Sequence, residues 1–161
     1  MQELNLPPFE YKVTQSGENL LIWDMLRRKQ VVLTPEEWVR QHVVHYLIDH
    51  LGYPKSLLSL ERGHAYNKRQ KRTDLCAFDA SGKPLLLVEC KASSVPLTSA
   101  VAMQIGTYNQ TIGAPLLLVT NGVQHFCWRV HSLNRTNQAL SFIPTYAEAL
   151  ELLALAHPDA P

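Results

Sequence analysis

The sequence predicts an α/β protein: a central mixed sheet with helices on both faces, and a β-hairpin extension at the N-terminus. Segments with helical periodicity alternate with short strand-like runs, and the run at 114–122 is apolar enough for a buried strand. After residue 33 the expected order is helix, strand, hairpin, helix, strand, strand, helix. Such an order is typical of a sheet covered by helices on each side.

Length and composition favour one compact unit. The 161 residues are 46% hydrophobic and 18% charged, enough for a real core. We expect a single domain over 1–161, with a β extension at 1–33, a core at 34–146, and a closing helix and tail at 147–161. No apolar run approaches the roughly 20 residues of a membrane helix, and the N-terminus lacks the pattern of a secretory signal. We therefore expect a cytoplasmic protein with no membrane attachment.

The cysteines and histidines indicate no metal or disulfide framework. Cys76, Cys90 and Cys127 lie in apolar strand-like segments, with neither a CxxC pair nor a histidine cluster nearby. They are typical of small buried hydrophobes in a reducing compartment. The seven histidines are scattered and are interpreted as structural or surface groups.

The N-terminal third predicts strands followed by a helix. Residues 9–14 and 20–24 flank the turn QSGEN, and 26–32 suggests another short strand or an irregular segment. The helix starts after Thr34, the expected cap, has Pro35 at its first position, and stops at Gly52. Its apolar positions recur at helical spacing and should face a sheet: Val39, Val43, Tyr46, Leu47 and Leu51.

The remaining elements follow from turn and cap signals. A strand at about 57–62 precedes a hairpin at 72–91, "RTDLCAFDASGKPLLLVECK", whose turn is DASGKP. A helix at 96–113 follows, with Thr98 or Ser99 near its cap and Gly113 at its end. Strands at 114–122 and 123–130 pair across TNG, and an amphipathic helix at 146–156 closes the chain.

The hairpin is expected to bring three charges together. If Asp79 pairs with Pro84 across a four-residue loop, then Asp74 lies opposite Glu89, and strand alternation places Lys91 on the same face. Directly opposed Cβ atoms are about 4.5–5.5 Å apart, and two carboxylates that close need a cation or a proton between them. A register slip of one residue would separate Asp74 from the other two.

Two close carboxylates suit a hard divalent cation such as Mg²⁺, and Mn²⁺ is equally acceptable. A neighbouring lysine can help deprotonate a metal-bound water and stabilise charge developing on phosphorus. This combination describes metal-dependent phosphodiester hydrolysis. The alternative is that Asp74, Glu89 and Lys91 are unrelated surface charges at strand ends, because this spacing also occurs by chance.

Three longer segments are more specific: "LTPEEWVRQHVVHYLIDHLGYPKSL", "KRTDLCAFDASGKPLLLVECKA" and "NQTIGAPLLLVTNGVQHFCW". In this order they resemble the N-terminal nuclease domain of the R subunit of type I restriction enzymes, in a small stand-alone version, within the PD-(D/E)XK nuclease superfamily. The resemblance covers about residues 10–146. It implies a restriction-endonuclease-like three-layer α/β/α core and a DNA endonuclease in which Asp74 and Glu89 bind metal and Lys91 completes the site. One departure is Thr73, where the family usually has proline.

The resemblance also implies supporting residues. Glu37 is expected as an accessory metal ligand, with Glu36 as the alternative. For either residue alone, an acidic first turn that complements the helix dipole is the favoured explanation. Gln104 and Tyr108 match the pattern Q-x-x-x-Y and share one helical face, from which they would contact the lysine region or a nucleic-acid backbone. As plain structure, Tyr108 would be a core aromatic and Gln104 a solvated polar group.

The formal net charge of +1 does not exclude DNA as a partner, because basic residues cluster before the hairpin. Lys68, Arg69, Lys71 and Arg72 are expected to steer the phosphate backbone, with a solvated loop as the alternative. Motor domains do not fit in 161 residues, so we expect DNA targeting to come from a protein partner, from the product of a neighbouring gene, or from DNA shape and ends in place of sequence. Two other function classes remain: a nuclease-fold module that binds nucleic acid or protein without cutting, and a structural domain that forms homodimers through the opening hairpin.

Overall fold

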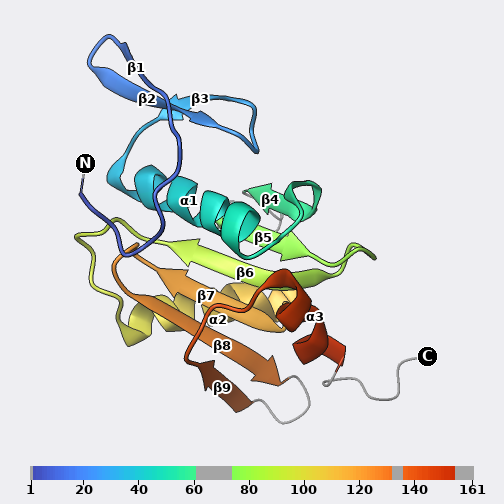
Figure 1. Ribbon diagram of the computed structural model, residues 1–161. Helices are drawn as coiled ribbons and strands as arrows, with labels where there is room; N and C mark the ends of the chain where they lie inside the picture. The colour runs from blue at the N-terminus through green and yellow to red at the C-terminus, as the bar shows by residue number, and fades with distance from the viewer. Residues whose placement is uncertain (1, 61–73, 132–135, 155–161) are drawn as a thin grey trace.

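The computed structural model describes residues 2–60, 74–131 and 136–154. Within them the strands form two sheets (Figure 1). A small antiparallel sheet contains β1 (Val13–Ser16), β2 (Asn19–Asp24) and β3 (Lys29–Val32). The larger, mixed sheet contains, in spatial order, β4 (Leu58–Leu60), β5 (Leu75–Phe78), β6 (Pro84–Cys90), β7 (Leu116–Thr120), β8 (His125–His131) and β9 (Thr136–Leu140).

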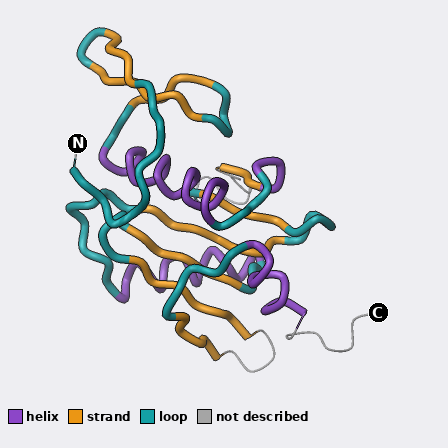
Figure 2. Tube along the Cα trace, in the orientation of Figure 1, coloured by secondary structure: helices purple, strands orange, loops and turns teal. Residues whose placement is uncertain are grey.

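Helices cover both faces of the larger sheet (Figures 1 and 2). Helices α1 (Pro35–His45) and α3 (Tyr146–Ala154) pack on one face, and α2 (Ser99–Ile112) packs on the other. Strands β6 and β7 are parallel, and α2 is the crossover between them. The expected three-layer α/β/α arrangement with a mixed sheet is confirmed. None of the helices in the described ranges is long and apolar enough to cross a membrane.

Helix α1 begins where the sequence predicted. The Thr34 side chain accepts a hydrogen bond from the Glu37 backbone N (3.1 Å), and Pro35 occupies the first turn. The expected α-helix to Gly52 is corrected after His45, because Tyr46–His50 forms a π-helical turn. The short 3-10 turn Lys55–Leu57 then leads into β4. The apolar positions lie inside as expected: Val39, Val43, Leu47 and Leu51 are buried, and Tyr46 is half-buried.

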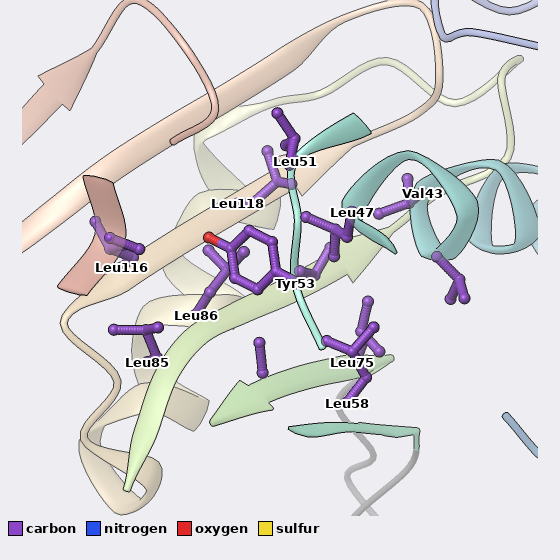
Figure 3. Packing of buried hydrophobic residues seen from close by; sticks show 14 of the residues in the cluster. Val43, Leu47, Leu51, Tyr53, Leu58, Leu75, Leu85, Leu86, Leu116 and Leu118 are labelled. Atoms are coloured by element: carbon purple, nitrogen blue, oxygen red, sulfur yellow. The ribbon is translucent and has the colours of Figure 1, made fainter. Parts of the chain in front are cut away.

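The larger core lies between the sheet and the layer formed by α1 and α3. Figure 3 shows the ring of Tyr53 among leucines from β6, β7 and the end of the first helical segment. Tyr53 is 1% exposed, and its hydroxyl donates to the Pro144 carbonyl oxygen (3.1 Å), which satisfies the buried polar group. A second cluster joins Ile105 of α2 to Leu87 and Leu117. The three cysteines are buried, as expected.

The N-terminal extension differs from the predicted hairpin in its first strand. That strand is Val13–Ser16, not 9–14, and β3 completes a three-stranded sheet. Residues 9–12 instead pass over α1, where the Phe9 ring stacks on His45 (centroids 4.1 Å apart) and Tyr11 meets Trp38 edge to face (4.9 Å). Aromatic packing against the helix outweighed the strand propensity of this segment.

Strand β9 was not predicted. It pairs with β8 at the edge of the larger sheet, with Trp128 opposite Ala139 and Arg129 opposite Gln138. Residues 137–139 are exposed, so the segment lacks the alternation of buried and exposed side chains that marks a strand in sequence. Its pairing with β8 is therefore a tertiary effect.

The β5–β6 hairpin keeps the expected register next to the charged residues. Leu75 pairs with Val88, and Cys76 pairs with Leu87. The turn was predicted wrongly, however, because Phe78 and not Asp79 pairs with Pro84. A bulge after Ala77 absorbs the one-residue difference.

Asp79 instead closes the turn. Its backbone N donates to the Lys83 carbonyl oxygen (2.9 Å), and its carboxylate accepts from the backbone N of Ser81 and of Lys83 (both 2.9 Å). A three-residue loop thus replaces the four-residue loop that was expected. The bulge is the reason that the wrong loop length did not shift the residues at the other end of the hairpin.

Candidate functional site

The three charged residues of the hairpin meet at one end of the larger sheet. Asp74 immediately precedes β5, Glu89 is the penultimate residue of β6, and Lys91 follows β6. Helix α1 reaches this end from one face of the sheet, and α2 reaches it from the other, as the contacts below show. The site is therefore built where both helical layers approach the end of β6.

Glu89 is the centre of one set of contacts. Lys91 Nζ donates to Glu89 Oε1 at 2.7 Å, and Gln104 Nε2 donates to the same oxygen at 3.2 Å. Gln104 Nε2 also lies 3.1 Å from the hydroxyl oxygen of Tyr108, its i+4 neighbour on α2. The structure thus brings Glu89, Lys91, Gln104 and Tyr108 together.

The second carboxylate oxygen of Glu89 receives no hydrogen bond from the residues that the structure describes. Glu89 is 3% exposed, and Oε2 is buried without a hydrogen bond among the described residues, an arrangement that is costly unless something else satisfies it. Burial raises the pKa of Glu89 and the charge of Asp74 adds to this, while Lys91 opposes it. Burial acts to lower the pKa of Lys91, but the hydrogen bond and charge of Glu89 outweigh burial and raise it. Lys91 is therefore a cationic donor at neutral pH.

Asp74 is held from two sides. Its Oδ2 accepts from the Cys90 backbone N at 2.6 Å, and its Oδ1 accepts from Arg40 Nη2 at 2.7 Å. The first bond fixes Asp74 to the end of β6, and the second ties it to α1. Arg40 was assigned no role from the sequence.

Glu37 is not brought to the other two carboxylates. Its Oε2 pairs with Arg40 Nη1, and its Oε1 accepts from Gln41 Nε2 (2.8 Å) and Arg27 Nη1 (3.2 Å). Arg40 therefore lies between Glu37 and Asp74. Glu36 also pairs with Arg40 Nη2 (3.1 Å). In the described ranges, no group of three or more His, Cys, Asp or Glu residues is arranged to hold a metal, so neither Glu36 nor Glu37 gains support as an accessory ligand.

The donor chemistry of the remaining pair fits a hard divalent cation. Carboxylate oxygens are preferred by Mg²⁺, which keeps several waters and needs only one or two protein carboxylates. Within residues 2–60, 74–131 and 136–154, Glu89 Oε2 is a buried acceptor without a donor. Each oxygen of Asp74 accepts one hydrogen bond and retains a further lone pair. Asp74 and Glu89 are thus the residues that could hold such an ion.

The basic stretch stays a prediction. Lys68, Arg69, Lys71 and Arg72 lie outside the described residues, as does Thr73. Residues 58–60 and 75–77, on either side of this stretch, pair as the antiparallel strands β4 and β5.

The mixed sheet between helical layers, with Asp, Glu and Lys at the ends of adjacent strands, defines a restriction-endonuclease-like domain. The family described as type I restriction enzyme R protein N terminus matches residues 35–144. The chain belongs to this family.

A solved structure shares the fold. It is a fragment of a candidate HsdR subunit of a type I restriction enzyme from Vibrio vulnificus YJ016, with a TM-score of 0.60 and 19% sequence identity. The similarity covers 78% of this chain and 26% of that chain, so the present chain spans about a quarter of the fragment. No curated protein matches the chain.

Proposed function

We propose that this chain is a metal-dependent nuclease domain that hydrolyses phosphodiester bonds of DNA in a restriction-type role. The observation that carries the proposal is the convergence of Asp74, Glu89 and Lys91 at one end of the β5–β6 hairpin, where one buried oxygen of Glu89 accepts no hydrogen bond from the described residues. Membership of the R protein N-terminal family supports the nuclease class. A protein partner that supplies DNA targeting is also part of the proposal, because the matched family and the HsdR fragment are parts of type I restriction enzyme subunits.

Each side chain of the site has a role in this proposal. Asp74 and Glu89 would hold Mg²⁺ or Mn²⁺, and the bound ion would supply Lewis-acid polarisation of the phosphate and activation of the attacking water. Lys91, oriented by Glu89, would place its positive charge where negative charge develops on the phosphate. Gln104, linked to Tyr108, would hold the Glu89 carboxylate in place. Lys68, Arg69, Lys71 and Arg72 would steer the DNA backbone.

The first test is the loss of the lysine. Lys91→Ala is expected to reduce DNA cleavage by roughly 10²–10³-fold, as for the removal of a preorganised electrostatic donor. Cleavage of circular, linear and single-stranded DNA with Mg²⁺ or Mn²⁺ measures it. Lys83→Ala is the matched control, because Lys83 is an exposed lysine in the turn of the same hairpin. A folded Lys91→Ala protein that cuts as fast as the Lys83→Ala protein refutes the assignment.

The second test is metal binding itself. Calorimetric titration of Mg²⁺ or Mn²⁺ is expected to give a binding signal with the parent chain and none with Asp74→Asn. This substitution removes the charge but leaves an oxygen that can accept from the Cys90 backbone N. Equal metal affinity in the two proteins would remove Asp74 from the proposed ligand set.

One observation favours a second function, a nuclease-fold module that binds nucleic acid or a protein partner without cutting. Arg40 already neutralises Asp74, and no third carboxylate joins the pair in the described ranges. This alternative predicts salt-sensitive DNA binding without metal-dependent turnover. The homodimer through the N-terminal sheet also stays a prediction, and sedimentation of the purified chain tests it.

A further inference from the structure

A continuous series of ion pairs leads from the N-terminal sheet to Asp74. It begins at Asp24, the last residue of β2, which is 0% exposed. Asp24 Oδ1 accepts from the backbone N of Leu26 (2.8 Å) and of Arg27 (2.9 Å), and its Oδ2 accepts from Arg27 Nη1 (2.6 Å). These bonds hold the turn that follows β2 and fix the direction in which the Arg27 side chain leaves it.

Arg27 joins this turn to α1. The nitrogen that binds Asp24 also donates to Glu37 Oε1 at 3.2 Å. Glu37 is 6% exposed and pairs through its other oxygen with Arg40. Arg40 in turn reaches Asp74 Oδ1 at 2.7 Å. The path from Asp24 to Asp74 therefore runs through Arg27, Glu37 and Arg40, and the last two lie on α1.

The charges make the position of Arg40 depend on Arg27. Arg40 is shared between Glu37 and Asp74, and a buried carboxylate that loses its cation is strongly destabilised. Arg27 also pairs with Glu37 and neutralises part of its negative charge. If Arg27 is removed, Glu37 has to draw more strongly on Arg40, which would move the guanidinium away from Asp74.

We propose that Arg27 is a positioning residue for the candidate centre: by sharing the charge of Glu37, it leaves the Arg40 guanidinium free to hold Asp74. The turn between β2 and β3 of the N-terminal sheet then contributes a side chain that positions the site. The catalytic consequence rests on the nuclease function proposed above. The effect on the geometry of Asp74 is independent of that function.

A local probe for this effect exists at the Cys90 amide, which donates to Asp74 Oδ2. Hydrogen exchange measured by NMR is expected to be about tenfold faster at Cys90 in Arg27→Gln, the equivalent of roughly one lost hydrogen bond. The amide of Leu118, in the middle of β7, serves as the internal reference for global stability. Arg28→Gln is the matched control, because Arg28 is the exposed neighbour in the same turn and undergoes the same change of charge.

Kinetics and a conservative variant separate positioning from mere loss of stability. With DNA as substrate, Arg27→Gln is expected to lower kcat about 10- to 100-fold, the range for residues that orient metal ligands, and to leave KM unchanged. Arg27→Lys, which keeps a cation near Asp24 and Glu37, is expected to restore most of both the Cys90 protection and kcat. If Arg27→Gln does not fold, the smaller effect of Arg27→Lys is compared with that of Arg28→Lys: exchange at Cys90 that is faster only in Arg27→Lys supports the proposal, and equal exchange in the two proteins overturns it.

The outcomes are distinguishable. Faster exchange at Cys90 alone, absent from Arg28→Gln, supports the proposal. Equal exchange at Cys90 in the Arg27→Gln and Arg28→Gln proteins, or equal acceleration at Cys90 and Leu118, overturns it. If the parent chain cuts no DNA, the nuclease function fails, while the exchange comparison still decides whether Arg27 positions Asp74.

Discussion

Arg40 is the residue on which the candidate centre depends most. It pairs with Glu36, Glu37 and Asp74 while its side chain is only 8% exposed. The surrounding carboxylates hold the pKa of Arg40 above its usual value although burial opposes this. A permanently charged group at this position pairs with two nearly buried carboxylates, those of Glu37 and Asp74.

Removal of Arg40 is therefore expected to destabilise the fold strongly. Arg40→Met keeps much of the side-chain volume but leaves Glu37 and Asp74 without their shared cation, a change that typically costs about 3–5 kcal/mol. The free energy of unfolding in urea measures it. Arg28→Met, the same replacement at an exposed position, is expected to change stability by no more than about 0.5 kcal/mol. Similar losses in both variants would mean that the buried network contributes little.

Helix α2 shows how one element carries the supporting residues of the site. Gln104 and Tyr108 lie one turn apart on the side that meets Glu89, while Ile105 and Asn109 are buried. Asn109 binds both the N–H and the carbonyl oxygen of Ala114 (2.8 Å each), and Gly113 ends the helix with φ of +74°. These contacts fix the C-terminal end of α2 and therefore which side chains of the helix face Glu89 and which face the core.

Replacement by alanine is expected to change stability in opposite directions at Gly106, within α2, and at Gly113, which ends it. Gly113→Ala forces an alanine into a left-handed conformation and should destabilise the protein by about 1–2 kcal/mol. At Gly106 an added Cβ meets nothing within 4 Å, so Gly106→Ala should stabilise the helix by about 0.5–1 kcal/mol. Thermal unfolding of the two variants measures both effects, and shifts of the same sign would contradict the assigned helix end.

At the scale of the whole molecule, the segment before β1, residues 2–12, makes contacts that link several elements. Trp38 Nε1 donates to the Gln2 carbonyl oxygen (3.1 Å), and the Ser93 hydroxyl donates to the Gln2 side chain (2.7 Å). Further along, the Asn5 backbone N donates to the Gly122 carbonyl oxygen (2.7 Å). The segment then crosses α1, where the Phe9 ring contacts His42 (centroids 4.7 Å). It thus spans the region between α1 and the β7–β8 turn before it enters β1.

The burial of His42 should make the stability of the fold depend on pH. Burial lowers the pKa of His42 and the nearby His45 adds to this, while the hydrogen bond to the Trp38 carbonyl oxygen opposes it. Below a pH of about 6.5 the unfolded chain therefore binds a proton that the folded chain resists, and stability falls until the pH reaches the lower folded pKa. His42→Asn is expected to reduce this loss in urea unfolding between neutral and mildly acidic pH. The exposed His50→Asn is the control, and equal slopes in the two variants would refute the attribution.

Much of the fold was predictable because its signals are local. The cap at Thr34, the glycine at the end of α2 and the apolar run of β7 each depend on residues that are neighbours in the chain. Strand β9 was missed because its exposed residues carry no period, and the first strand was misplaced because Phe9 packs on α1. The hairpin turn was wrong by one residue because a bulge does not show in a pattern of alternation.

The candidate site divides in the same way. The sequence by itself determined which charges share the end of the hairpin, because strand alternation and antiparallel pairing are geometric consequences of short chain segments. Only the tertiary structure decided the partner of each charge. Arg40 and Asp74 are 34 residues apart, and Arg27 reaches Glu37 of α1 from the turn between β2 and β3. Such pairings depend on how separate elements pack and on which buried charges need neutralising, and no local pattern in the sequence encodes either one.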